Sequence, residues 1–140
     1  MSTEIEVLFV IGFGPVVTDV EANLTLFRDT LGLPVKAGPG EPDYFTTSRL
    51  DGVKNFGMWP LHSAAMSCFG RPEWPADMPA PTAWIEFDVA DIAVAGRVLK
   101  AKGYRLLAEA RREPWGQTVT RFLSADGLLV GVTLTPSLRT

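Results

Sequence analysis

The sequence predicts an α+β fold of two tandem βαβββ modules, whose strands form a concave mixed sheet with the helices on its outer face. Three kinds of local signal occur twice in the same order, which indicates an internal repeat. They are helix N-cap aspartates (Asp19 and Asp91, 72 residues apart), helix-stop glycines (Gly32 and Gly103, 71 apart) and Asp-Gly turns (Asp51-Gly52 and Asp126-Gly127, 75 apart). Each module has one helix and therefore leaves one sheet face free. Two such faces are expected to form a concave cup.

The first module is expected at about residues 5–69. Thr18-Asp19 is a typical helix N-cap, Val20, Leu24, Phe27 and Leu31 then form one apolar stripe, and Gly32 is placed at the C′ position. The predicted elements are a strand at Val7–Val17, a helix from Asp19 to Gly32, a short strand at Leu33–Lys36, a hairpin of Tyr44–Leu50 and Lys54–Trp59, and one or two helical turns at Leu61–Phe69.

A linker at about residues 70–81, with four prolines, leads to the second module at about 82–136. Its predicted elements are a strand at Thr82–Val89, a helix from Asp91 to Gly103, a strand at Tyr104–Leu107 and a terminal hairpin turning at Ala125-Asp126-Gly127. Asp-Gly between β-branched residues is a strong hairpin signal. Gly131, in the middle of the last strand, marks a bulge or a place where another group approaches the backbone.

Composition excludes several classes of protein. A chain of 140 residues with 46% hydrophobic residues is one globular domain. A net charge of −3 and a pI near 5.1 argue against nucleic-acid binding. Val7–Val17 is about half a membrane span, and no basic residue precedes it, so neither a membrane span nor a secretory signal is expected. The single cysteine, Cys68, is expected to be a buried thiol in a cytoplasmic protein.

The segment Val17–Val35, with Phe-Arg-Asp ahead of Leu-Gly-Leu, resembles the first-helix signature of the glyoxalase/bleomycin-resistance/extradiol-dioxygenase superfamily, also called the vicinal oxygen chelate fold. Ser124–Gly127 resembles the closing turn of that family. The resemblance covers the whole chain. It implies paired βαβββ modules, commonly in a homodimer, with a concave sheet that encloses the active or binding site.

Enzymes of that superfamily hold a divalent metal with His, Gln or Glu side chains from equivalent strands of both modules. The resemblance carries these positions onto Gly12, Trp84 and Gly131, and near Gly57. Glycine has no side-chain donor atom and the indole N–H does not coordinate metals. This chain therefore resembles the metal-free members, and no cofactor is expected.

Strand alternation predicts that Trp84, Glu86 and Asp88 face the cup, while Ile85, Phe87 and Val89 pack under the helices. The Glu86 carboxylate has three possible roles: a salt bridge with an arginine such as Arg121, contact with a ligand, or general-base catalysis. Arg121 lies beside Gly131 if the hairpin loop contains a bulge, and opposite Val132 if the turn is tight.

Four tryptophans are many for this length. Trp59 and Trp84 are predicted on cup strands, Trp115 at the mouth and Trp74 in the linker. Each alone is more typical of a core, but beside Gly12, Gly57 and Gly131 they suggest a pocket with aromatic walls.

His62 is the only histidine, so it cannot supply a multi-histidine metal site. We expect a structural or surface role for it, with a ligand contact as the alternative. The charged run Glu109–Glu113 is most simply a solvated strand end.

The leading hypothesis is a metal-independent protein that sequesters or senses a small aromatic or hydrophobic compound, either antibiotic-like or a metabolite, and acts as a homodimer. The alternative is a lyase, isomerase or dioxygenase that uses a metal or takes Glu86 as its general base. A third possibility is an interaction module whose concave face holds a peptide.

Overall fold

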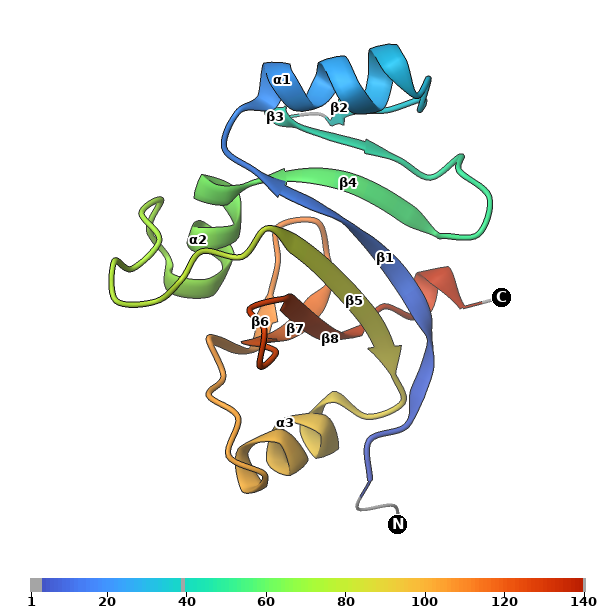
Figure 1. The fold of residues 1–140 in the computed structure, drawn as a ribbon. Coiled ribbons are helices and arrows are strands. Elements are labelled where there is room, and N and C mark those ends of the chain that lie inside the picture. The colour runs from blue at the N-terminus through green and yellow to red at the C-terminus, as the bar shows by residue number, and fades with distance from the viewer. Residues whose placement is uncertain (1–3, 39, 140) are drawn as a thin grey trace.

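The computed structural model describes residues 4–38 and 40–139. They form one eight-stranded mixed sheet in the order β2-β3-β4-β1-β5-β8-β7-β6 (Figure 1). The strands are β1 (Val7–Val17), β2 (Lys36–Gly38), β3 (Glu41–Thr47), β4 (Asn55–Pro60), β5 (Ala83–Val89), β6 (Ala108–Arg112), β7 (Thr118–Leu123) and β8 (Leu129–Leu134). The α-helices are α1 (Val20–Leu24), α2 (Leu61–Phe69) and α3 (Ile92–Ala101).

The two halves of the sheet repeat one arrangement, so the predicted α+β fold of tandem βαβββ modules is confirmed. In each half the first strand pairs in parallel with the last, β1 with β4 and β5 with β8. The antiparallel pairing of β1 with β5 joins the halves at the centre. The helices that follow β1 and β5 pack on the outer, convex face.

The helix of the first module begins as predicted, because the Asp19 carboxylate accepts from Ala22 N at 3.0 Å. After α1 it continues as π-helical turns over Thr25–Thr30, with an i→i−5 bond from Leu31 N to Leu26 O. The wider turns rotate the apolar stripe. Leu31, the last residue of the predicted apolar stripe, is 58% exposed, so the buried part of the stripe ends before it.

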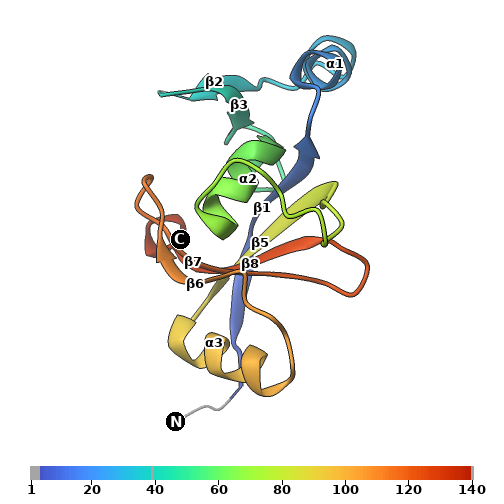
Figure 2. The ribbon, with the colours of Figure 1, turned by 90° about the vertical axis from the view of Figure 1, so that its left-hand side faces the viewer.

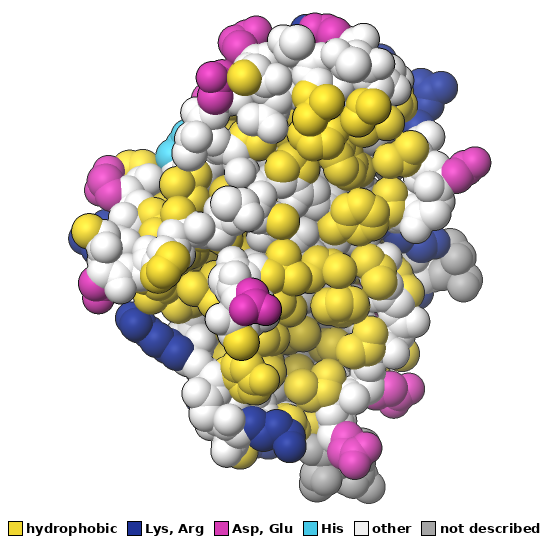
Figure 3. Space-filling model, viewed as in Figure 1, with side chains coloured by type: hydrophobic (Ala, Val, Ile, Leu, Met, Phe, Trp, Pro, Cys, Tyr) yellow, Lys and Arg dark blue, Asp and Glu magenta, His cyan; other side chains and the backbone are white. Residues whose placement is uncertain are grey.

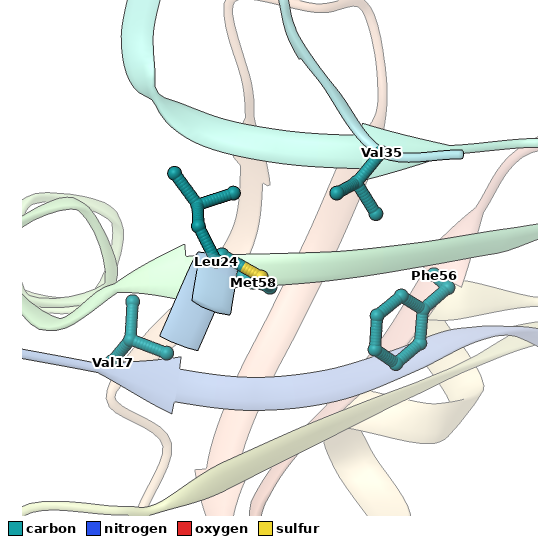
Figure 4. Close-up of a cluster of buried hydrophobic side chains, with 5 residues drawn as sticks. All are labelled: Val17, Leu24, Val35, Phe56 and Met58. Atoms are coloured by element: carbon teal, nitrogen blue, oxygen red, sulfur yellow. The ribbon is translucent and has the colours of Figure 1, made fainter. Parts of the chain in front are cut away.

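The core under this helix contains side chains from the helix, from β1 and β4, and from the segment before β2. It consists of Val17, Leu24, Val35, Phe56 and Met58 (Figure 4). The matching core under α3 contains Val89, Ala95, Leu99 and Val132. Each module therefore has its own small core beneath its own helix.

Two predicted strands are wrong in extent. Val35 is part of the first core, so β2 begins only at Lys36. Tyr104–Leu107 does not form a strand, although Leu107 N already donates to Arg121 O of β7 at 2.8 Å. Pairing with β7 begins at Ala108, and Ala110, with φ 47°, interrupts its register.

The predicted helical turns at Leu61–Phe69 form α2, which lies between the two halves in side view (Figure 2). Its Ala64 and Cys68 pack against Trp59, Trp84 and Leu129. Burial raises the pKa of the Cys68 thiol to about 11, as suits a structural cysteine. Helix α2 thus closes one end of the concave face. No described helix is long and apolar enough to cross a membrane.

The convex face is bare between the helices that follow β1 and β5. Ile85 and Phe87, predicted to pack under the helices, are only half-buried and belong to none of the buried clusters, whereas Val89 does pack there. Their neighbours on β1, Val10 and Phe13, are 40% and 41% exposed. Hydrophobic side chains accordingly gather over β1 and β5 (Figure 3).

Candidate functional site

A cavity of about 870 Å³ lies on the concave side of the sheet. Side chains of β3, β4, β1, β5 and β7 line it, together with the turn Pro114–Gln117 and the C-terminal residues 135–138. We call this cavity the cup. Asp88, predicted to face the cup, instead lies outside its lining, where its carboxylate accepts from Thr135 N at 2.8 Å and Arg139 Nε at 2.6 Å. It anchors the C-terminal segment at the rim.

The glycine positions do not leave empty space in the floor of the cup. A Cβ on Gly12 would lie 3.1 Å from the Trp84 ring and would overlap the Asn55 backbone oxygen. One on Gly57 would lie 2.8 Å from the Tyr44 ring. A Cβ on Gly131 would lie 2.9 Å from Glu86 Cγ. Neighbouring side chains, and at Gly12 also the Asn55 carbonyl, therefore fill the space where the resemblance places metal ligands.

An ion pair lies at the centre of the floor. Arg121 Nη1 donates to Glu86 Oε2 at 2.8 Å, and Arg121 pairs with Gly131, which settles the register left open by the sequence. The guanidinium also stacks over Trp59, 4.5 Å from the ring centroid. Arg121 is completely buried and the Glu86 side chain is 10% exposed, so the salt bridge predicted as one role of Glu86 is present.

A second carboxylate, that of Glu113, is linked to Arg121 through Ser67. Arg121 Nε donates to Ser67 Oγ at 2.8 Å, and Ser67 Oγ donates to Glu113 Oε1 in a short bond of 2.5 Å. Arg111 Nε lies 3.8 Å from the same carboxylate. The prediction of a solvated run at Glu109–Glu113 is therefore wrong for Glu113, which is 3% exposed because α2 and β6 close over it.

The turn that carries Trp115 is tied to this ion pair at both ends. Gln117 Nε2 donates to Glu86 Oε1 at 3.0 Å, and Trp115 Nε1 donates to Gln117 Oε1 at 2.9 Å. At the other end Glu113 joins the arginine through Ser67, while Gly116, with φ 94°, lets the turn close. A continuous hydrogen-bonded ring thus links the mouth of the cup to its floor.

The predicted tryptophans are placed unequally. Trp59 and Trp84 border the cup but are each only 3% exposed, since their rings stack edge to face and Trp84 Nε1 donates to Gly57 O. Trp115 is 49% exposed at the mouth. Trp74 packs on Phe69 outside the cup. The aromatic surface offered to a ligand therefore comes mainly from Trp115 and from Tyr44, a residue that sequence reasoning missed.

His62 lies outside the cup. It borders an adjoining hollow of about 190 Å³ and lies 3.5 Å from the Asp43 carboxylate, with both side chains more than half exposed. This placement fits the surface role expected for it.

The missed residues are Tyr44, Ser67, Glu113 and Gln117. Their signals were weak: Ser67 is a polar residue within an apolar helix, and Gln117 directly precedes a β-branched strand. Burial raises the pKa of the Tyr44 hydroxyl, and the nearby Glu86 carboxylate raises it further, so this phenol stays neutral.

The residues present do not fit a metal ion. No group of three or more His, Cys, Asp or Glu side chains in the described part of the chain could hold one. The Arg121 guanidinium occupies the cation position beside Glu86, the one carboxylate in the floor. A second cation there would be repelled at close range.

The chain belongs to the glyoxalase/bleomycin resistance protein/dioxygenase superfamily, whose family model matches residues 13–132. No curated protein matches the sequence. Among solved structures, the fold is similar to that of a superfamily member from Vibrio splendidus 12B01, at 20% identity and a TM-score of 0.57, covering 94% of this chain and 100% of that one.

Two further structures of this fold are methylmalonyl-CoA epimerases. The enzyme from Mycobacterium tuberculosis has 18% identity and a TM-score of 0.62, covering 99% of this chain and 95% of that one. A variant from Streptomyces coelicolor in complex with 2-nitronate-propionyl-CoA has 20% identity and a TM-score of 0.61, covering 96% and 99%. At these identities the likeness shows the fold alone.

Proposed function

We propose that the protein binds a small, largely aromatic or hydrophobic molecule in the cup without a metal ion, and that it sequesters or senses this compound in the cytoplasm. One observation carries the proposal. At three of the positions where the resemblance places metal ligands, this chain has glycines whose space is filled by Trp84, Tyr44, Glu86 and the Asn55 backbone, beneath a cavity of about 870 Å³. A volume of this order suits a drug-sized ligand.

The lining supports a ligand with few polar groups. Tyr44 and Trp115 offer aromatic surface, and the charged side chains of the lining come in opposite signs, Glu41 with Lys54 and Glu86 with Arg121. A balanced lining neither attracts nor repels net charge strongly. Ligand affinity would come mainly from apolar contact, with a few hydrogen bonds fixing the orientation.

An enzyme of the same superfamily is the second candidate, because Glu86 lines the cup and could take a proton from a ligand. Both carboxylate oxygens already accept hydrogen bonds, from Gln117 and Arg121. With both oxygens held in this way, the Glu86 carboxylate is better suited to accept hydrogen bonds in a fixed position than to act as a mobile general base. If the protein converts a ligand, and Glu86→Gln abolishes this turnover while the ligand still binds, the protein is an enzyme and not only a binding protein.

The binding proposal is tested by thermal-shift screening of aromatic antibiotics and metabolites. A ligand at about 100 times its Kd should stabilise the protein by about 2.7 kcal/mol. Trp115→Ala should reduce the shift, because it removes an exposed ring at the mouth. Leu31→Ala, at a residue that is also exposed but lies outside the lining, should not. Stoichiometric zinc, iron or manganese in the purified protein would overturn the metal-independent function.

We further propose that the protein is a homodimer formed through the bare convex strip. Val10 and Phe13 on β1, with Ile85 and Phe87 beside them on β5, make this strip apolar. Because β1 and β5 run antiparallel at the centre of a repeated arrangement, the strip has an approximate twofold symmetry of its own. Such a surface suits a second copy of the same surface.

A further inference from the structure

We infer that the ligand of the cup carries a neutral carbonyl-type oxygen that accepts a hydrogen bond from Nη2 of Arg121. This inference rests on the proposed binding function and adds the chemistry that the site would recognise. Arg121 Nε is bound by Ser67 and Nη1 by Glu86, but no atom in the described part of the chain accepts from the buried Nη2.

The unpartnered donor is held in place. The guanidinium is fixed by partners on two elements, Ser67 on α2 and Glu86 on β5, and its face rests on Trp59. Turning Nη2 toward another acceptor would break at least one of these bonds, because the guanidinium is a rigid planar fork. Arg121 also belongs to the lining of the cup. An acceptor from a ligand would relieve the cost of this buried, unpaired donor, so a hydrogen bond there should add more to the binding free energy than one at an exposed donor.

The charges select a neutral acceptor. The buried cluster contains the carboxylates of Glu86 and Glu113 and the guanidinium of Arg121, and Arg111 lies at its edge. Their formal charges cancel. A ligand carboxylate at Nη2 would therefore add an uncompensated negative charge close to two acidic side chains, whereas a ketone, amide or quinone oxygen would accept the bond without adding charge.

Access requires a small movement. Arg121 has no exposed surface, so a ligand oxygen must displace a neighbouring side chain to reach it. Gln117 joins the ion pair to the exposed Trp115, and it is the candidate for this movement. Ser67 and Glu113 hold the arginine from the opposite side and act as positioning residues.

A matched series of probes tests the inference on the full chain. Benzophenone carries a neutral carbonyl between two rings, diphenylmethane lacks the oxygen, and diphenylacetate carries a carboxylate. In calorimetric titrations we expect benzophenone to bind about tenfold more tightly than either of the others, the ratio expected for one hydrogen bond to a charged donor. The carbon-13 resonance of the bound carbonyl should move downfield, as a hydrogen bond to a guanidinium requires.

The double variant Arg121→Met with Glu86→Met removes the guanidinium donor and its paired carboxylate together, and should abolish the preference for benzophenone while keeping diphenylmethane binding. Arg97→Gln, on the exposed side of α3, should change nothing. If the double variant does not fold, the wild-type series and the carbonyl resonance still decide. Equal binding of diphenylmethane, or tighter binding of diphenylacetate, would overturn the inference and leave the binding function standing. Binding of none of the three would count against both.

Discussion

At the scale of single residues, Gly131 shows how a missing side chain builds the floor of the cup. It lies on β8 opposite Arg121 and beside Glu86, and the ion pair occupies the volume that a side chain would need. In the resemblance this position belongs to a metal ligand. Here the absence of a side chain allows the salt bridge to form in its place.

We therefore expect Gly131→Ala to destabilise the protein by about 1–3 kcal/mol, the usual effect of overpacking. The added Cβ would lie 2.9 Å from Glu86 Cγ, 3.2 Å from Val119 Cγ2 and 3.3 Å from Arg121 Nη1. Chemical denaturation measures the effect. Gly38→Ala is the matched control, because a Cβ there meets nothing within 4 Å. Equal stability of the two variants would show that the floor is looser than the structure indicates.

At the scale of elements, the two modules use the same device to start a helix. Asp19 and Asp91 both lie in extended backbone and accept from amides of the first turn. Asp91 accepts from two, Ala93 N at 3.0 Å and Val94 N at 3.1 Å. Helix α3 covers the core of the second module, so its start also fixes the strands that present Glu86 and Arg121 to the cup.

Asp91→Ala should lower the free energy of unfolding by about 1 kcal/mol, since it leaves the first-turn amides of α3 without their acceptor. Thermal or urea unfolding would measure the loss, and Asp91→Asn should recover most of it. Asp77→Ala, in the exposed loop between the modules, serves as the control and should have little effect. A loss as large in Asp77→Ala would mean that the cap is not the cause.

At the scale of the whole molecule, the convex strip decides whether the protein acts alone. Phe13→Lys places a charge at the centre of the proposed dimer interface, where burying it against a second copy is costly. We expect the wild type to sediment as a dimer and Phe13→Lys as a monomer. Leu31→Lys changes a more exposed residue away from the strip and should remain dimeric. A wild type that is monomeric at all accessible concentrations would refute the proposal.

Sequence reasoning predicted the large elements well because their signals are local. Asp19, Asp91, Gly32 and Gly103 cap or stop helices through contacts a few residues away, and these positions were correct. The exposure of Leu31 at the end of the apolar stripe was not predicted, because π-helical turns change the helical period without a signal in the sequence.

For the candidate site, the sequence suggested Arg121 as one possible partner of Glu86, left its register open and gave no signal for Ser67 or Glu113. The contact of Ser67 with Arg121 joins residues 54 positions apart, and that of Ser67 with Glu113 joins residues 46 apart. No short-range pattern marks such a pair. The same holds for Tyr44, whose ring fills the space above Gly57 only because β3 lies beside β4.

Residue types at given places in the chain were enough to predict the repeated βαβββ order and the helix limits, and they leave no metal-coordinating atom at the positions that the resemblance assigns to metal ligands. What fills the space at those positions depends on the tertiary structure. Strand register placed Arg121 against Gly131 and Glu86, and the packing of α2 brought Ser67 to the arginine. Register and helix docking depend on the whole sheet, and no local pattern in the sequence predicts that Nη2 of Arg121 finds no acceptor among the described residues.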